Sequence, residues 1–296
     1  MKSGFVSLIG RPNVGKSTLL NAIINQKIAI TSDKPQTTRN VIQGIYTDDE
    51  YQIVFIDTPG IHKPINKLGK VLNKEAQAET KDVDAILFLV DGSTGLGEGD
   101  KRIISTFTPD QPVFLVINKI DKITKDQLLK VITDYKDLFD FAEIIPISAA
   151  GKNNIDELIN TVKKYITEVG MYFSPDEITS SSMSFLASEF VREKLFRLTE
   201  EEIPHTITCV TTKFEEKKDL IEINVDIIVD RDNIKKIIIG KQGSLLKTVG
   251  IQARHDIEML TGKKVYLELY VKTVKNWRDK EKYLHELGFN EKDLFI

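Results

Sequence analysis

The sequence has a single cysteine, no long apolar run and a small net charge, and each of these limits the classes of protein to which it can belong. A single cysteine, Cys209, excludes a disulfide within the chain and fits a reducing compartment. We interpret Cys209 as a small packing residue of an apolar strand. No apolar run approaches the ~20 residues that cross a bilayer. We therefore expect a soluble, cytoplasmic protein, and leave open a peripheral contact at the inner face of the cell membrane.

The net charge of the chain is also small. The 296 residues carry a formal charge of −3 at pH 7, so no overall positive field draws the molecule to nucleic acid. Any such binding must come from a local patch. Hydrophobic residues make up 41% of the chain, which is ordinary for a folded protein and argues against disorder. A chain of this length has room for two domains.

Short apolar runs alternate with helical patterns from Phe5 to about Ile166. The runs are FVSLIG, YQIVFID, AILFLVD, VFLVIN and AEIIPIS. The helical segments are Lys16–Asn25, Lys67–Thr80, Gly99–Thr106, Thr124–Leu138 and Ile155–Val169. This alternation predicts an α/β domain, with a mostly parallel sheet and flanking helices, over residues 1–173. The polar stretch SPDEITSSS is the predicted linker, residues 174–182.

The order of elements changes after the linker. The pattern predicts a helix, two strands, two helices, a strand and a short C-terminal helix. Their ranges are Met183–Leu198, Thr206–Phe214, Leu220–Val229, a helix ending at Ile239, Ser244–Leu260 and Lys264–Val271. We interpret residues 183–296 as a compact α+β domain.

Residues Gly10 to Ser17 read GRPNVGKS, a full match to G-x-x-x-x-G-K-[ST] between a predicted strand and a predicted helix. The glycines let the backbone wrap around phosphate, and the loop N–H groups and the helix N-terminus attract its charge. We predict that Lys16 reaches the β- and γ-phosphates and that the Ser17 hydroxyl coordinates Mg²⁺.

The sequence Asn118-Lys119-Ile120-Asp121 selects the base. It follows the apolar run VFLVI. A carboxylate at Asp121 can accept hydrogen bonds from guanine N1–H and its exocyclic amine, a donor pair that adenine lacks. A site built for these bonds rejects the wrong base, because its polar groups would be left unpaired.

Three further segments complete a guanine nucleotide site. Asp57-Thr58-Pro59-Gly60 ends a strand, so that Asp57 is predicted to hold Mg²⁺ through water and the Gly60 N–H to contact the γ-phosphate. Thr38, in the polar stretch Gln36–Arg39, is predicted to complete the Mg²⁺ shell when a γ-phosphate is present. The backbone amides of Ile147-Ser148-Ala149 are predicted to approach guanine O6.

The predicted residues fall into two sets. Lys16, Thr38, Asp57 and Gly60 are expected to act in hydrolysis. The nucleotide-binding set is Gly10, Arg11, Pro12, Asn13, Val14, Gly15, Lys16, Ser17, Thr18, Asp57, Thr58, Pro59, Gly60, Ile61, Asn118, Lys119, Ile120, Asp121, Ile147, Ser148 and Ala149.

The ordered motifs resemble the five-part signature of the GTPase superfamily, and within it the Era-type branch of the translation-factor-related GTPases. One position departs from the Ras-like pattern, because Ile61 stands where a water-orienting glutamine is found. We expect slow intrinsic turnover, and interpret His62 as an ordinary loop residue. The resemblance implies that Asn13 helps to bind K⁺ near the phosphates, while a purely structural role for Asn13 stays open.

Ile239-Gly240-Lys241-Gln242-Gly243 joins two predicted helices and matches the G-x-x-G loop that clamps a nucleic-acid backbone in KH domains. The helix-first order indicates the prokaryotic, type II arrangement. Between Arg231 and Lys282 there are 13 Lys or Arg and 6 Asp or Glu, a local basic excess. Single-stranded RNA is the expected ligand and DNA is not expected. Three aromatic residues are interpreted as packing, with no base stacking assigned to them: Tyr266, Tyr270 and Trp277.

The resemblance covers the whole chain, because the second domain also matches. It implies GTP and GDP with Mg²⁺ as ligands, the 3′ end of small-subunit ribosomal RNA as partner, and a role in 30S subunit assembly. We expect a monomer. The alternative is an RNA-binding assembly chaperone for which GTP is a conformational ligand and hydrolysis is incidental.

Overall fold

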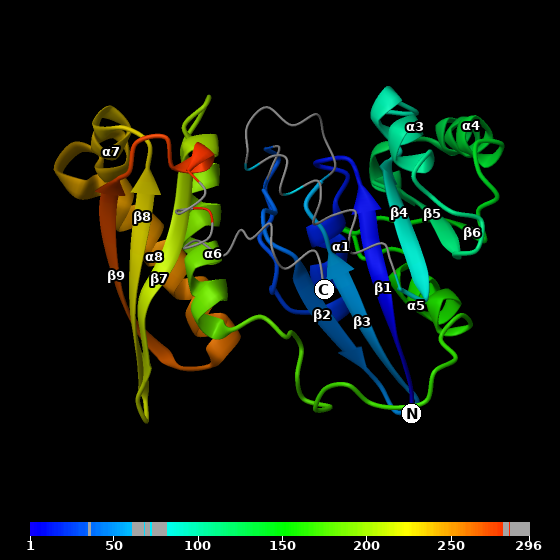
Figure 1. The fold of residues 1–296 in the computed structure, drawn as a ribbon, viewed down its shortest axis with the longest axis horizontal. Helices are drawn as coiled ribbons and strands as arrows, with labels where there is room; N and C mark the ends of the chain where they lie inside the picture. The colour runs from blue at the N-terminus through cyan, green and yellow to red at the C-terminus, as the bar shows by residue number, and fades with distance from the viewer. Residues whose placement is uncertain (35–36, 61–67, 69–71, 73–81, 281–283, 285–296) are drawn as a thin grey trace. The chain divides into compact units, whose positions relative to one another are not determined.

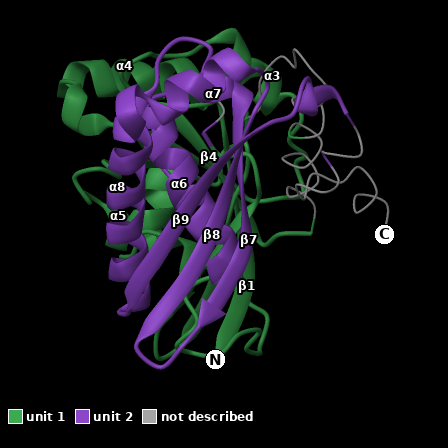
Figure 2. Cartoon of the chain, turned by 90° about the vertical axis from the view of Figure 1, so that its left-hand side faces the viewer, with its two compact units in different colours: residues 1–29, 38–65, 69–180 green, residues 30–37, 66–68, 181–296 purple. Residues whose placement is uncertain are grey.

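The computed structural model describes residues 1–34, 37–60, 68, 72, 82–280 and 284. The chain divides into two compact units (Figure 2). Unit 1 comprises Met1–Ala29, Thr38–Ile65 and Gly69–Ser180, and unit 2 comprises Ile30–Thr37, Asn66–Leu68 and Ser181–Ile296. Within the described ranges, no helix is both long enough and apolar enough to span a membrane.

Unit 1 is built on a six-stranded sheet (Figure 1). Its strands are β1 (Lys2–Gly10), β2 (Ile42–Thr47), β3 (Tyr51–Asp57), β4 (Ala85–Asp91), β5 (Val113–Asn118) and β6 (Glu143–Pro146). They lie in the order β2-β3-β1-β4-β5-β6, and every neighbouring pair is parallel except β2 with β3. The predicted α/β fold with a mostly parallel sheet is confirmed.

Helices cover both faces of this sheet. They are α1 (Lys16–Ile24), α3 (Glu98–Ile104), α4 (Lys125–Lys136) and α5 (Ile155–Lys163). α1 packs on β2, β3 and α5, whereas α3 and α4 contribute Ile103, Val131 and Tyr135 to a core with alternate residues of β4 and β5. Every residue of β4 and β5 is buried, as expected of parallel strands covered on two sides.

The structure differs from the sequence-based prediction at β2 and α5. β2 was missed because Gly44 interrupts its apolar residues, and it lies in a stretch interpreted as a polar loop. The predicted helix Ile155–Val169 ends at Lys163, and the chain then turns back so that Val169 pairs with Lys2. The predicted helix Lys67–Thr80 lies outside the described residues except at the buried, helical Leu68 and Leu72.

Unit 2 has the predicted order of elements from its first helix to its last strand, whereas the predicted C-terminal helix falls mainly on residues outside the described ranges. The elements that follow this order are α6 (Met183–Leu198), β7 (Ile207–Glu216), β8 (Leu220–Val229), α7 (Asp232–Ile239), α8 (Ser244–Thr261) and β9 (Lys264–Thr273). The sheet order is β7-β8-β9, so β9 is an edge strand, parallel to β8. Alternate residues of β8, with Val191, Leu195 and Val249 from α6 and α8, form the core beneath the sheet. This is the predicted α+β arrangement.

The polar face of α6 is buried by segment Ile30–Thr37, which belongs to unit 2. Arg192 is fully buried and forms an ion pair with Glu189 at 2.5 Å. Its guanidinium also donates to the Thr37 carbonyl at 2.6 Å, and Glu193 accepts from the Thr31 N–H at 2.9 Å. Buried charges require such partners, so these bonds fix the course of the segment.

Candidate functional site

Two glycines of the phosphate loop are required by close contacts at the carboxyl end of the sheet. A Cβ on Gly10 would lie 2.4 Å from the Leu89 carbonyl oxygen of β4. Gly15 has φ +103°, and a Cβ there would lie 2.3 Å from the Asn118 side-chain nitrogen. No larger residue fits either position, so the loop is held against the strand ends from which the other motifs emerge.

The Lys16 amine rests on the loop itself. It donates to the Gly10 and Arg11 carbonyl oxygens at 3.2 and 3.3 Å, and the side chain is buried. Burial lowers the pKa of Lys16, and the negative charge of Asp57 opposes that shift. The amine therefore lies at the phosphate loop with its charge poorly solvated, and its contact with the β- and γ-phosphates stays a prediction.

The three residues predicted to hold Mg²⁺ converge. The Ser17 hydroxyl donates to one Asp57 carboxylate oxygen at 2.6 Å and lies 2.8 Å from the Thr38 hydroxyl oxygen. The other Asp57 oxygen, Oδ1, is buried and has no hydrogen-bond partner among the described residues. One carboxylate and two hydroxyls suit Mg²⁺, which keeps several waters and takes its other ligands from nucleotide phosphates. The residues therefore fit this ion.

Mg²⁺ affinity should depend on pH through Asp57. Burial raises the pKa of this carboxyl to about 6, against the lowering effects of Lys16, Ser17 and Thr38. Because the metal requires the deprotonated form, the Asp57 contribution to Mg²⁺ affinity should be constant above this pKa and fall about tenfold per pH unit below it. Mg²⁺ titration of the GDP complex from pH 4.5 to 8 measures this.

The matched variant is Asp57→Asn, which cannot titrate at this position. Phosphate groups titrate in both proteins, so the difference between the two profiles isolates the carboxyl. Profiles that run parallel over the whole range would contradict the assignment.

Hydrogen bonds join the base-reading motif to the phosphate loop. The Asn118 amide donates to the Val14 carbonyl at 2.8 Å. The Lys119 amine donates to the Asn13 carbonyl at 2.7 Å and to the Asp91 carboxylate at 2.6 Å. Asp91, the last residue of β4, was not predicted from the sequence. Asp91 holds the Lys119 side chain across the phosphate loop. The sequence feature that could have pointed to Asp91 is its position at the end of a buried apolar strand.

Asp121 is held by Ser148. The Ser148 hydroxyl donates to the Asp121 carboxylate and accepts from the Gly151 N–H at 3.1 Å. The backbone amides predicted to meet guanine O6 are already engaged within the protein. Ile147 donates to Ile117, Ser148 to Asn153, and Ala149 to the Asn118 side chain at 2.9 Å. The contact from this segment to guanine O6 stays a prediction, and it requires one of these bonds to exchange.

Gly60 lies against the phosphate loop, because a Cβ there would come within 2.8 Å of the Pro12 nitrogen. Thr58 is buried and its hydroxyl donates to the Leu8 carbonyl at 2.8 Å. The predicted contact of the Gly60 N–H with a γ-phosphate stays a prediction. Ile61 and His62 lie outside the described residues.

Arg11 ties the phosphate loop to α3, a contact that was not predicted. Its guanidinium donates to the buried Asp100 carboxylate at 2.9 Å, and the second oxygen of Asp100 accepts from the Gly97 N–H at the start of α3. A Cβ on Gly99 would lie 2.7 Å from the Arg11 Cδ, too close for any residue but glycine while the arginine stays in place. No sequence pattern joins residues so far apart in the chain.

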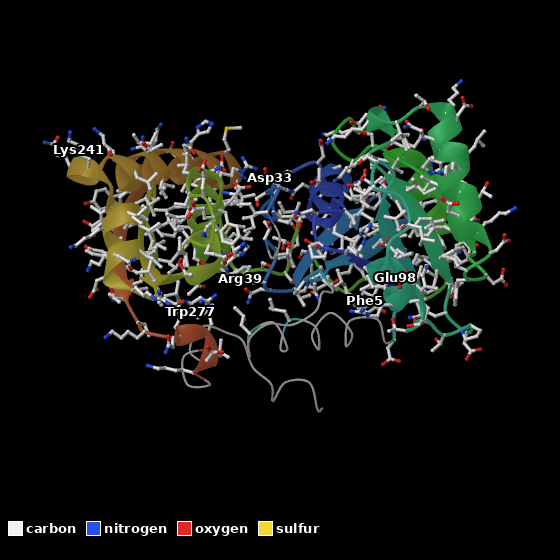
Figure 3. The ribbon with its side chains drawn as sticks, turned by 90° about the horizontal axis from the view of Figure 1, so that it is seen from above. Phe5, Asp33, Arg39, Glu98, Lys241 and Trp277 are labelled. Atoms are coloured by element: carbon white, nitrogen blue, oxygen red, sulfur yellow. The ribbon has the colours of Figure 1, made fainter. Side chains whose placement is uncertain are left out.

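The loop between α7 and α8 has a backbone conformation that lets a ligand come close to its main chain. Gly240, Gln242 and Gly243 have φ values of +73°, +52° and +76°. Lys241 is exposed and is labelled at this loop in Figure 3. The N-cap residue of α8 is Gly243, which has no side chain to cap the helix, and the first helical N–H, that of Ser244, donates to the Lys241 carbonyl within the loop.

A groove continues from this loop along α8. A cavity of about 380 Å³ is lined by Gly243, Leu246, Lys247, Gly250, Ile251 and Arg254 on one side and by Val265, Tyr266, Leu267 and Leu269 of β9 on the other. Among these described residues, two are basic and none is acidic. An apolar floor with a basic rim suits unstacked bases joined by phosphates.

The interpretation of the three aromatic residues is corrected in part. Trp277 is fully buried and donates to the Thr206 carbonyl, as a packing residue does. Tyr266 and Tyr270 are instead 52% and 48% exposed, because they lie on the face of β9 that points away from the core. Their hydroxyls each donate to one oxygen of Glu268 at 2.8 Å. These bonds raise the pKa of both tyrosines.

The fold and the two sites define the class of protein. A phosphate loop, the three residues predicted to hold Mg²⁺ and the Asn118–Asp121 motif meet at the carboxyl ends of one mostly parallel sheet, which is the arrangement of a P-loop GTPase. A G-x-x-G loop beside an apolar groove, in a helix-first α+β unit, is a KH domain.

Comparisons with known proteins identify the family. A family model described as a 50S ribosome-binding GTPase matches residues 5–119, and a KH domain model matches residues 202–278. A crystal structure of Era with MgGDPNP and nucleotides 1506–1542 of 16S ribosomal RNA is 40% identical to this chain. It has a TM-score of 0.93 and covers 98% of this chain and 99% of its own. A variant of Aquifex aeolicus Era bound to GDP and AlF4− gives the same values. The chain belongs to the Era family of GTPases.

Proposed function

We propose that this protein binds GTP with Mg²⁺, hydrolyses it slowly to GDP and phosphate, and binds the 3′ end of small-subunit ribosomal RNA through its KH domain during assembly of the 30S subunit. The observation that carries the proposal is the bonding of Asn118 to Val14 and of Lys119 to Asn13. These two bonds hold a guanine-specific motif at a fixed position relative to a phosphate loop. A nucleotide with both guanine and phosphates is the ligand that satisfies the two together.

Hydrolysis in this proposal rests on charge and positioning. Lys16 and the loop amides are placed to stabilise the charge that develops on the transferred phosphoryl group. Mg²⁺ held by Ser17 and Thr38, and by Asp57 through water, would add to this stabilisation. With isoleucine at position 61 there is no glutamine to orient the attacking water. We expect single-turnover hydrolysis by the isolated protein at a rate close to the intrinsic rate of Ras, about 10⁻⁴ to 10⁻³ s⁻¹. A rate of several per second without a partner would contradict this.

Asn13 is the proposed contact to K⁺. It lies exposed in the phosphate loop with φ +64°, and Lys119 fixes its carbonyl. We expect faster hydrolysis in K⁺ than in Na⁺ at equal ionic strength, and a loss of that difference in Asn13→Ala. Equal rates of the native protein in the two salts would show that Asn13 only stabilises the loop.

The RNA ligand is proposed from the groove and from the family. The crystal structure of Era with MgGDPNP contains nucleotides 1506–1542 of 16S ribosomal RNA, so the corresponding fragment is the probe to use. Filter binding of this fragment and of its DNA counterpart tests the preference for the 2′-hydroxyl. Equal binding of both would overturn the choice of RNA. A vesicle flotation assay tests the remaining expectation, peripheral membrane contact.

We propose that the nucleotide state is passed to the KH domain along the chain between Thr37 and Thr38. Thr37 belongs to unit 2, where its carbonyl accepts from Arg192 of α6. Thr38 belongs to unit 1, where its hydroxyl contacts Ser17. A γ-phosphate that reorients Thr38 would therefore displace Thr37, whose carbonyl is hydrogen-bonded to α6, the first helix of the KH domain.

Coupling along this route would distinguish a GTP-driven switch from an RNA-binding assembly chaperone for which hydrolysis is incidental. The experiment measures RNA affinity without nucleotide, with GDP and with a non-hydrolysable GTP analogue, and then measures turnover with and without RNA. A switch requires affinities that differ between GDP and the analogue, by a factor that Arg192→Met reduces. Equal affinities and RNA-independent turnover would favour the chaperone.

A further inference from the structure

We propose that Tyr266, Glu268 and Tyr270 form a docking site for an arginine side chain on the surface of a basic protein partner. The three residues lie at alternate positions of β9, on the face of the sheet opposite to its hydrophobic core. The inference goes beyond the binding of GTP and RNA and does not depend on either.

The outer face of this sheet is accessible in the described part of unit 2. Tyr266 and Tyr270 are 52% and 48% exposed. The residues between and beside them, Leu267 and Leu269, point to the other face and pack against the core with α6 and α8. Figure 2 shows the outer face of the sheet, with β8 and β9 in front of α6. A partner can therefore reach the three side chains directly.

The hydroxyl protons of the cluster are used within it. Tyr266 and Tyr270 each donate to a different oxygen of Glu268 at 2.8 Å. These bonds raise the pKa of both tyrosines and lower the pKa of Glu268, so the phenols stay neutral and the carboxylate stays charged. A phenol that donates keeps acceptor lone pairs, and a carboxylate has about four acceptor positions. The cluster therefore offers only acceptors to an incoming group.

The charge of Glu268 has no ion pair among the described residues. The neighbouring carboxylates of the same face are each paired with lysine: Glu215 and Glu222 with Lys213 at 3.1 and 2.7 Å, and Asp226 with Lys272 at 2.5 Å. The residue opposite Glu268 on β8 is the neutral Asn224. A negative charge surrounded by acceptors suits a cation that carries several N–H donors, and it repels a phosphate group.

Arginine matches this cluster better than lysine does. Its guanidinium is planar and has five N–H donors, so it can bond to a carboxylate and to nearby phenol oxygens together. The two tyrosines each lie about 7 Å along the strand from position 268, one on either side. A guanidinium that pairs with the carboxylate therefore also meets aromatic rings, to which it is attracted. Tyrosine and arginine are both enriched in protein–protein interfaces, which favours a protein as the partner.

The test uses the full-length protein with 3-fluorotyrosine in place of tyrosine, and an acetylated and amidated pentapeptide of sequence Gly-Arg-Gly-Arg-Gly. Fluorine NMR signals are assigned with Tyr266→Phe and Tyr270→Phe. We expect the peptide to shift both signals, because the guanidinium changes the electric field at the two rings. The same peptide with citrulline in place of arginine keeps the shape and loses the charge, so it should shift neither signal.

Glu268→Gln should weaken binding of the arginine peptide about fourfold, because it removes the charge and keeps the size of the side chain. The matched control is Glu215→Gln. This carboxylate lies exposed on the same face but is already paired with Lys213, so its variant should bind as the native protein does. The lysine version of the peptide should bind at least about threefold more weakly than the arginine version.

Equal shifts with the citrulline peptide, or equal affinity of Glu268→Gln and the native protein, would overturn the docking site. Equal affinity for the lysine and arginine peptides would overturn the choice of a guanidinium. If the fragment of nucleotides 1506–1542 shifted both signals and the arginine peptide did not, the face would bind RNA instead. Thermal melts show that each variant is folded. Failure of the peptide to bind leaves the proposed function unaffected, because the groove and the nucleotide site are not altered.

Discussion

Replacement of Gly240 and Gly243 by aspartate should abolish RNA binding and leave GTP binding unchanged. Both glycines have positive φ, a conformation that aspartate adopts only with strain. Their carboxylates would also repel the phosphates of an RNA strand beside the exposed Lys241. We expect RNA affinity to fall at least about 100-fold at moderate salt. Filter binding with the 16S fragment and a GDP titration of the same preparation measure the two activities.

The chain offers a control for strain. Gly262 ends α8 with φ +68°, and a Cβ there meets nothing within 4 Å, as at Gly243. Gly262→Asp therefore introduces the same strain and the same charge, at the other end of the helix. Gly243→Lys keeps the strain and reverses the charge, so it should bind RNA better than Gly243→Asp. If Gly262→Asp were as damaging as the loop variants, the assignment of the loop would be wrong.

The second large effect is expected at Lys16. Lys16→Met keeps an unbranched apolar side chain in the buried position and removes the amine that now donates to Gly10 and Arg11. The charge-assisted bonds to the β- and γ-phosphates are then lost. We expect GTP affinity to fall about 100-fold or more and hydrolysis to become undetectable. Fluorescent nucleotide titration and phosphate release give the two values.

RNA binding without nucleotide should survive this change, because no groove residue is altered. Lys130→Met, on the exposed face of α4, is the matched control and should match the native protein. The melting temperature without nucleotide should stay within about 5 °C of the native value. Retained GTP affinity in a folded Lys16→Met variant would contradict the role given to this lysine.

The sequence predicted those parts of the nucleotide site that lie at the ends of strands. Asp57 and Asn118 end β3 and β5, Ser17 follows the loop that leaves β1, and parallel strands bring their carboxyl ends to one edge of the sheet. The convergence of Ser17 and Asp57 could therefore be expected without coordinates. Thr38 could be placed near them only through the resemblance, because the stretch that carries it has no periodic pattern.

Contacts that depend on packing between distant segments were not predicted. Arg11 and Asp100 lie 89 residues apart, and nothing in either segment specifies the other. β2 was missed because Gly44 removes the side chain that would complete its pattern. A Cβ there would collide with Leu20, Ile24 and Ile28, so the glycine is required by α1 and the loop after it.

Only the G-x-x-G loop of the groove was predicted from the sequence. The loop Gly240–Gly243 has a sequence signature, but the residues that extend it do not. Lys247, Gly250 and Arg254 lie on the cavity side of α8 because residues three and four apart share one face of a helix. The position of Val265 beside them depends on how β9 meets α8, a tertiary relation that local patterns do not encode.

The central claim is that a phosphate loop binds a guanosine nucleotide whose base Asp121 reads, and competition binding with Asp121→Asn tests it most directly. The native protein should prefer GTP to ATP and to xanthosine triphosphate by at least about 100-fold. The variant should lose affinity for GTP and gain affinity for xanthosine triphosphate, because asparagine can donate to the oxygen that replaces the exocyclic amine of guanine. Equal affinity of the native protein for ATP and GTP, or an unchanged preference in the variant, would contradict the claim.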